Sequence, residues 1–226
     1  MGDQRVILVG ATGMVGGCAL RVCLDNPDAA SVTVIGRRSC GVNDPKLTEI
    51  VHDDFMDFPG IADALAGHDV AIFCVGAYTG TVADDDFRRT TVDTTVAFAK
   101  VLREKSPQAS FSFLSGRGAD RSESSRIAFA RYKGAAENAL LGLRFPRVHI
   151  FRPGYIYPVV PREEPNVMYR WTRALWPVVR RVYPNIGLTS EDLARAMVHA
   201  GLYGTGGHEG PILENRDIRE LATAAE

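Results

Sequence analysis

The first residues along the chain that could do chemistry are three glycines in a G-x-x-G-x-x-G pattern, Gly10, Gly13 and Gly16. They follow an apolar, β-branched segment at 5–9 and open a helical apolar pattern at 14–24. Glycines in such a turn let the backbone approach a pyrophosphate, whose charge is stabilised by the free N–H groups and dipole of the helix N-terminus. The alternative is a turn that only permits close packing of strand against helix. The predicted dinucleotide-binding turn comprises Gly10, Thr12, Gly13, Met14, Val15 and Gly16.

Two arginines at the end of the second predicted strand indicate which dinucleotide is bound. Units that prefer NAD usually place an acid about 20 residues beyond the glycine turn, where it accepts a hydrogen bond from the ribose 2′-hydroxyl. This chain has Arg37 and Arg38 there instead. Because a guanidinium offers a planar fork of donors to phosphate oxygens, the pair predicts recognition of a 2′-phosphate and hence NADP(H). The alternative is a solvated loop in which both arginines face a surface carboxylate.

The ends of three further predicted strands supply more candidate contacts. Asp54 follows the third strand and is a candidate acceptor for the adenine amino group, or else a cap of the next turn. The fourth strand ends at Val75, Gly76 and Ala77, where we expect backbone contacts to the cofactor. Ser115 closes the fifth strand. Since open α/β sheets bind ligands at the carboxyl ends of their strands, these residues are expected at one edge of a sheet.

The elements that position these residues alternate regularly along the chain. The apolar runs are continuous, which is typical of parallel strands buried on both faces. Strands are predicted at 5–9, 32–35, 49–52, 70–75, 110–114, 148–151 and 212–213. Helices are predicted at 14–24, 61–66, 84–104, 123–143 and 218–222. This alternation predicts an α/β fold with a doubly wound, mostly parallel sheet, the Rossmann fold, and helices on both faces.

Length and composition fit a single domain over 1–226. The 226 residues are 46% apolar and 23% charged, close to globular averages, and they can enclose one core. Four prolines interrupt the alternation after the sixth strand, so 153–190 is predicted as a small lid or substrate-side segment. Thr189 opens another helix, with Asp192 three residues later in a capping-box-like start.

Charge and cysteine usage exclude several classes of protein. Twenty-six basic and 27 acidic residues leave a net charge of −1, which excludes non-specific polyanion binding. The four cysteines and five histidines show no metal-ligand spacing, so reduced thiols and no metal site are expected. The chain has neither a signal-peptide core nor a membrane-span-length apolar run. A cytoplasmic protein is predicted, without nucleic-acid or membrane contact; the alternative is binding through a basic helix at 168–182 with Trp171 and Trp176.

Several motifs together resemble those of one known family. Besides the glycine turn and the arginine pair, they are LSGRGAD at 114–120, Lys133-Gly134 and FRPG at 151–154. On these motifs the chain, from about residue 6 to residue 221, resembles an atypical short-chain dehydrogenase/reductase of the HIV Tat-interacting-protein type, which includes bacterial NAD(P)H-binding relatives. The resemblance implies an NADPH-binding, oxidoreductase-like protein. Some members have regulatory rather than metabolic roles, so the resemblance implies a cofactor more firmly than a reaction.

The catalytic pair of this family is Tyr-x-x-x-Lys on the helix after the fifth strand. In the family the tyrosine is the general acid, and the lysine binds the nicotinamide ribose. Lys133 matches the lysine, but the residue four positions earlier is Phe129, which has no proton to donate. The resemblance makes Ser115 the hydroxyl that polarises a carbonyl, although Gly116 stands where the family tends to have a second serine. Tyr132 is a candidate substitute acid, or an amphipathic packing residue.

The loop after the sixth strand borders the nicotinamide in this fold. Pro153 and Gly154 are predicted cofactor contacts there, and Tyr155 is a second candidate acid or a packed loop aromatic. Because of Phe129, two functions stay open. One is an NADP(H)-dependent carbonyl reductase of weak or altered activity, and the other is a non-enzymatic NADPH sensor or protein-interaction regulator. The predicted partners are an unidentified small-molecule substrate, a protein partner and a second copy of the chain in a homodimer.

Overall fold

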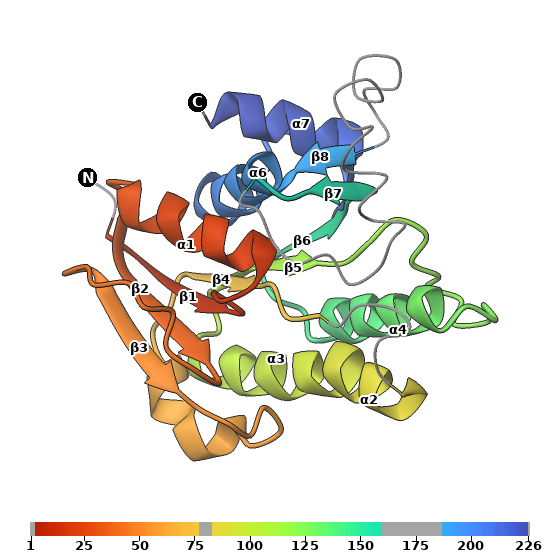
Figure 1. Ribbon diagram of the computed structural model, residues 1–226, viewed down its shortest axis with the longest axis horizontal. Coiled ribbons are helices and arrows are strands. Elements are labelled where there is room, and N and C mark those ends of the chain that lie inside the picture. The colour runs from red at the N-terminus through yellow and green to blue at the C-terminus, as the bar shows by residue number, and fades with distance from the viewer. Residues whose placement is uncertain (1–2, 77–82, 160–186, 226) are drawn as a thin grey trace.

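Seven parallel strands form the central sheet of the molecule (Figure 1). The computed structural model describes residues 3–76, 83–159 and 187–225. The strands are β1 (Gln4–Val9), β2 (Ala29–Gly36), β3 (Leu47–Val51), β4 (Val70–Phe73), β5 (Ser110–Leu114), β6 (Arg147–Arg152) and β9 (Ile212–Glu214). Their order is β3-β2-β1-β4-β5-β6-β9, so the winding reverses between β1 and β4. This confirms the predicted doubly wound sheet, in which ligands bind at the carboxyl ends of the strands beside the reversal.

Helices cover both faces of the sheet (Figure 1). One face packs against α1 (Met14–Asp25), α6 (Ser190–Tyr203) and α7 (Asn215–Ala224), and the other against the 3₁₀ helix η1 (Phe58–Leu65), α3 (Thr94–Lys105) and α4 (Ala128–Gly142). In β1, Val6 and Leu8 belong to the first core and Ile7 and Val9 to the second, and all four are fully buried. Successive strand residues face opposite sides of a sheet, which explains why the strands read as continuous apolar runs.

Two predicted helices differ from the structure for local reasons. The helix expected at 84–104 consists of α2 (Asp84–Arg88), a π-helical turn η2 (Arg89–Asp93) and α3. The helix expected at 123–143 begins only at Ala128. Before it, the Asp120 carboxylate accepts hydrogen bonds from the N–H groups of Ser122, Ser124 and Ser125, which hold these residues in a loop. Such side-chain bonds compete with helix formation.

Two short strands were not predicted. β7 (Tyr155–Tyr157) follows β6, β8 (Gly187–Thr189) precedes α6, and the two pair in parallel as a separate two-stranded sheet. Thr189 caps α6 as predicted, because its hydroxyl accepts a hydrogen bond of 3.0 Å from the N–H of Asp192. Most of the predicted lid, including the expected helix at 168–182, lies outside the described residues, as does Ala77.

Candidate functional site

The glycine turn lies between β1 and α1, where the winding of the sheet reverses. Gly10 has a φ of +94°, in the left-handed region that side chains disfavour. The N–H of Gly13 donates a hydrogen bond of 2.9 Å to the Gly10 carbonyl. A Cβ on Gly16 would stand 2.1 Å from that same carbonyl oxygen. The turn therefore closes only with glycine at positions 10 and 16.

The N-terminus of α1 is open toward the carboxyl edge of the sheet. Gly13 is its N-cap, and within the described residues no side chain caps it and no acid stands in its first turn. The first N–H groups of a helix have no intrahelical partner, and together with the helix dipole they favour an anion. This is the chemistry that a pyrophosphate requires.

Three adjoining cavities follow this edge. The central cavity, of about 380 Å³, is lined by these predicted site residues: Gly13, Met14, Val15, Val75, Gly76, Ser115, Lys133, Pro153 and Gly154. The α1-side cavity, of about 450 Å³, includes Thr12, Gly13, Met14 and Arg38. The β3-side cavity, of about 230 Å³, includes Arg37, Asp54 and Val75. The α1-side cavity shares Gly13 and Met14 with the central cavity, and the β3-side cavity shares Val75 with it, so the three adjoin along this edge.

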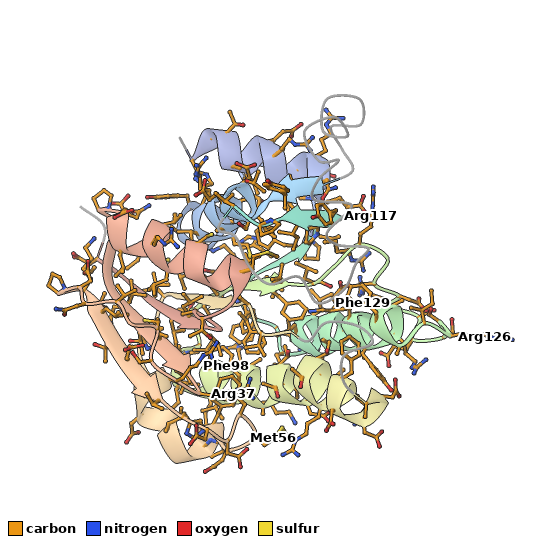
Figure 2. The ribbon with its side chains drawn as sticks, in the orientation of Figure 1. Arg37, Met56, Phe98, Arg117, Arg126 and Phe129 are labelled. Carbon is orange, nitrogen blue, oxygen red and sulfur yellow. The ribbon has the colours of Figure 1, made fainter. Side chains whose placement is uncertain are left out.

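The two predicted arginines line different cavities. Arg38 lines the α1-side cavity together with Thr12 of the glycine turn. Arg37, labelled in Figure 2 with Met56, lines the β3-side cavity with Asp54. The Asp54 carboxylate also accepts a hydrogen bond of 2.9 Å from the N–H of Met56, so it caps this turn while it lines the cavity. The two arginines therefore lie in different cavities, although they are neighbours in the chain.

The π-helical turn supplies lining residues that sequence reasoning missed. Arg89 and Thr90 of η2 and Thr94 at the start of α3 line the β3-side cavity opposite the loop after β3. A π-helical turn is rare and recurs at functional sites. The sequence carries no local signal for it, because the run from 84 to 104 reads as one uninterrupted helix.

Lys133 is buried beneath the central cavity, with only 6% of its surface exposed. Its ammonium donates a hydrogen bond of 2.8 Å to the carbonyl of Leu114 and lies 5.0 Å from the ring centroid of Phe113. Burial lowers the pKa of this amine to about 8, and the nearby Glu137 carboxylate opposes that shift. Lys133 is therefore a buried cation held at the end of β5, where it can bind a ligand hydroxyl.

Ser115 donates its hydroxyl hydrogen within the protein. Its Oγ lies 2.5 Å from Oε1 of Glu137, a fully buried carboxylate. Glu137 also accepts from Nε of Arg152 at 3.0 Å and from Nη2 at 2.5 Å. Since a hydroxyl has one hydrogen, Ser115 presents only lone pairs to the central cavity. The predicted role of Ser115 as a donor that polarises a carbonyl therefore does not match this geometry.

Phe129 and Gly116, the two departures from the family pattern, touch each other. Phe129 projects from the start of α4 (Figure 2) and lines the central cavity. A Cβ on Gly116 would lie 2.4 Å from Cζ of this ring. The phenyl ring therefore fills the space that a serine side chain at position 116 would need, and the two replacements belong together.

Tyr132 faces away from the central cavity, which corrects its prediction as a substitute acid. Its hydroxyl donates a hydrogen bond of 2.5 Å to the Asp84 carboxylate, and its ring packs against Phe87. Both partners belong to α2. Neighbouring helical residues point about 100° apart, so Lys133 can face the cavity only if Tyr132 turns toward α2.

Tyr132→Phe is expected to leave NADPH binding and turnover unchanged. The variant loses the hydrogen bond that the hydroxyl donates to Asp84 and the one that it accepts from Arg131, at a cost of about 1.5–3 kcal/mol of the free energy of unfolding. Urea unfolding measures the loss of stability. NADPH titration measures cofactor affinity, and NADPH oxidation measures turnover. A tenfold drop in turnover would contradict the structure and restore Tyr132 as an acid.

The loop after β6 is anchored from the last helix. The N–H of Gly154 donates a hydrogen bond of 2.8 Å to the side-chain oxygen of Asn215, a buried residue at the start of α7. Tyr155, the second candidate acid, lines the central cavity together with Lys133. Sequence reasoning gave Asn215 no role, because 61 residues separate it from Gly154.

Comparison with known proteins gives distant relatives. No protein-family model matches the chain. The rat protein HTATIP2 is 30% identical over 158 residues, which span 69% of this chain and 64% of the rat protein, less than two thirds of its length. The mitochondrial protein fmp52 of Aspergillus clavatus is 29% identical over 208 residues, which span 88% of this chain and 87% of the fungal protein.

Solved structures share the fold at low sequence identity. The Bordetella bronchiseptica enzyme WbmH, in complex with NAD⁺, has a TM-score of 0.69 at 16% identity over 98% of this chain and 80% of that one. An oxidoreductase of the short-chain dehydrogenase/reductase family from Burkholderia thailandensis has a TM-score of 0.68 at 16% identity, over 94% of this chain and 91% of that one. The chain thus has the Rossmann fold.

The prediction of a cytoplasmic protein is wrong by these comparisons. The fungal relatives, from Aspergillus clavatus, Debaryomyces hansenii and Aspergillus fumigatus, are named mitochondrial. The prediction depended on the absence of a signal-peptide core and of long apolar runs, and these criteria do not distinguish compartments within the cell. Among the described helices, none combines the length and apolarity that crossing a membrane requires.

Proposed function

Because the chain is an atypical short-chain dehydrogenase/reductase of the HIV Tat-interacting-protein type, we propose that it binds NADP(H) along the three cavities and is a carbonyl reductase of altered activity. The observation that carries this proposal is the continuity of the glycine turn with the cavity above Lys133. The open N-terminus of α1 and the absence of side chains at Gly10 and Gly16 fit a dinucleotide pyrophosphate.

Each half of the cofactor has a matching set of residues. Lys133 would bind the nicotinamide ribose hydroxyls from the floor of the central cavity, with Pro153 and Gly154 in its wall. Arg37 and Asp54 would border the adenine in the β3-side cavity. Arg38 and Thr12 would bind the 2′-phosphate in the α1-side cavity. NADPH, when bound, supplies a hydride.

Carbonyl reduction requires a proton as well as a hydride, and this site departs from its family in the source of that proton. Phe129 has no proton to donate, and the Ser115 hydrogen points at Glu137. Tyr155 also lines the central cavity and is the second candidate acid, but its hydroxyl oxygen is buried. Without a positioned acid, carbonyl reduction loses a factor of about 10² to 10⁴. Weak or altered activity is therefore proposed.

Phe129 also supports a second candidate function. A protein that keeps the glycine turn and Lys133 but lacks the acid fits a non-enzymatic NADPH sensor, in which occupancy of the site changes a partner surface. Screening NADPH oxidation against a panel of carbonyl compounds separates the two functions, because only the reductase consumes NADPH. The predicted protein partner and homodimer remain predictions.

Arg38→Ala is expected to weaken NADPH binding 10- to 100-fold and to leave NADH binding unchanged. A guanidinium–phosphate hydrogen bond is worth about 1.5–3 kcal/mol, which corresponds to roughly that factor. Calorimetric titration with both cofactors measures it. Arg37→Ala is the matched control, since loss of an adenine contact weakens NADPH and NADH equally. A wild-type protein that binds NADH more tightly than NADPH would refute the assignment of NADP(H).

A further inference from the structure

Glu137 is a fully buried acid beside the central cavity, one helical turn beyond Lys133 on α4. A carboxylate is costly to bury unless it is paired and hydrogen-bonded. Glu137 meets this condition, because both of its oxygens accept hydrogen bonds from the Arg152 guanidinium and one also accepts from Ser115. The three residues thus connect α4 with the carboxyl ends of β5 and β6.

The first consequence concerns the direction of the Ser115 hydrogen bond. Both Glu137 oxygens already accept hydrogen bonds from Arg152, so the hydrogen between Ser115 and Glu137 belongs to the serine. At 2.5 Å this is a short, charge-assisted bond, which a ligand carbonyl does not easily replace. The Ser115 oxygen is left as an acceptor for a donor in the cavity, such as an amide N–H or a ribose hydroxyl.

The second consequence concerns the charge of Lys133. The groups around its ammonium are Glu137 of α4, Cys74 after β4, and Leu114 and Phe113 of β5. Arg152 of β6 bonds to Glu137, and Tyr155 of β7 lines the same cavity as Lys133. Burial raises the pKa of the Cys74 thiol to about 12, so this group is neutral at physiological pH. Among these groups Glu137 therefore supplies the negative charge.

We propose that Glu137 is a positioning residue of this site: its carboxylate turns the Ser115 hydroxyl away from the cavity and places an anion one helical turn from the Lys133 ammonium. This role of Glu137 serves the proposed binding of NADP(H), and its functional meaning rests on that proposal. In this arrangement the floor of the cavity offers two kinds of group to a ligand: the N–H donors of the Lys133 ammonium and the lone pairs of the Ser115 hydroxyl. That pattern suits the ribose hydroxyls and the carboxamide of a nicotinamide nucleoside.

The direct test is the titration of Lys133 in the protein without cofactor. The chain has only four lysines, Lys46, Lys100, Lys105 and Lys133, so NMR of ¹³Cε-labelled lysine resolves each one. Lys133→Met identifies the Lys133 signal. The wild-type midpoint is expected near pH 8, because burial lowers the pKa of this amine to about that value. In Glu137→Gln the midpoint moves to lower pH, since loss of a neighbouring anion disfavours the ammonium.

Two further variants keep this test decisive. Glu220→Gln makes the same charge change at an exposed ion pair of α7 with Arg216, and it should leave the Lys133 midpoint unchanged. Glu137→Gln leaves the Arg152 cation unpaired and risks unfolding. The double variant Glu137→Gln/Arg152→Met, which removes both charges, is therefore measured in parallel, and circular dichroism confirms the fold of each protein. Identical Lys133 titration curves in the wild type and in the folded Glu137 variant would overturn the inference.

The pH dependence of NADPH affinity gives a functional readout. Lys133 is charged below its midpoint, so wild-type affinity should decline above about pH 8. In Glu137→Gln the decline begins at lower pH, and at pH 8 the affinity is expected to be about tenfold weaker than in the wild type. If the wild-type protein binds no NADPH, the proposed function fails, while the NMR titration still decides the role of Glu137. Unchanged pH profiles in the variant would count against that role.

Discussion

Phe129→Tyr is expected to raise NADPH-dependent carbonyl reduction about 100-fold. A positioned general acid contributes about 10² to 10⁴ to the rate, and position 129 is where the family places it, four residues before Lys133. In this protein the end of the Phe129 ring points at Gly116, which has no side chain there. The added hydroxyl extends from Cζ toward this glycine, so the ring has to turn in the wall of the central cavity to make room for it.

The gain is measured as NADPH oxidation across a carbonyl panel, with three comparison variants. Phe129→Leu removes the ring without adding a hydroxyl and should stay at the wild-type rate. Gly116→Ser should lower stability by about 1–3 kcal/mol, because its side chain overlaps the Phe129 ring. Tyr155→Phe reports whether the native activity depends on that hydroxyl. Equal rates for wild type and Phe129→Tyr would mean that the missing acid is not what limits this protein.

Gly16→Ala is expected to abolish NADPH binding, with at least a 100-fold loss of affinity. The new Cβ would lie 2.1 Å from the carbonyl oxygen of Gly10, a backbone atom that cannot move without opening the turn. Opening the turn displaces the N–H groups of α1 that would bind the pyrophosphate. A 100-fold loss of affinity corresponds to about 2.7 kcal/mol of binding free energy. One extra methyl group in a tightly packed site typically costs a similar amount, about 1–3 kcal/mol.

Gly17→Ala is the matched control for this substitution. It adds the same methyl group one residue later, where the Cβ would lie 3.2 Å from the carbonyl oxygen of Ala11. A neighbour at that distance has to shift only slightly, so NADPH affinity should stay within a few-fold of the wild type. Calorimetric titration and thermal unfolding of both variants measure the contrast. Normal NADPH binding by Gly16→Ala would show that the turn is not the phosphate site.

The sequence determined the fold class and the phosphate turn because both depend on local patterns. Continuous apolar runs such as Val6 to Val9 require burial on two faces, and regular alternation with helices then leaves a doubly wound sheet as the simplest solution. The glycine spacing between 10 and 16 fixes a backbone geometry within seven residues. Residues just after the strands, such as Val75 and Gly76, line the central cavity because the carboxyl ends of parallel strands meet at one edge of the sheet.

Side-chain direction and pairing over long sequence distances were decided by the tertiary structure alone. Arg37 and Arg38 are neighbours in the chain, yet they line different cavities. Tyr132 joins Asp84 across 48 residues, and Ser115 joins Glu137 across 22. Each outcome depends on how a helix is rotated about its axis against the sheet. That rotation is set by packing of the whole core, and no local pattern of residues encodes it.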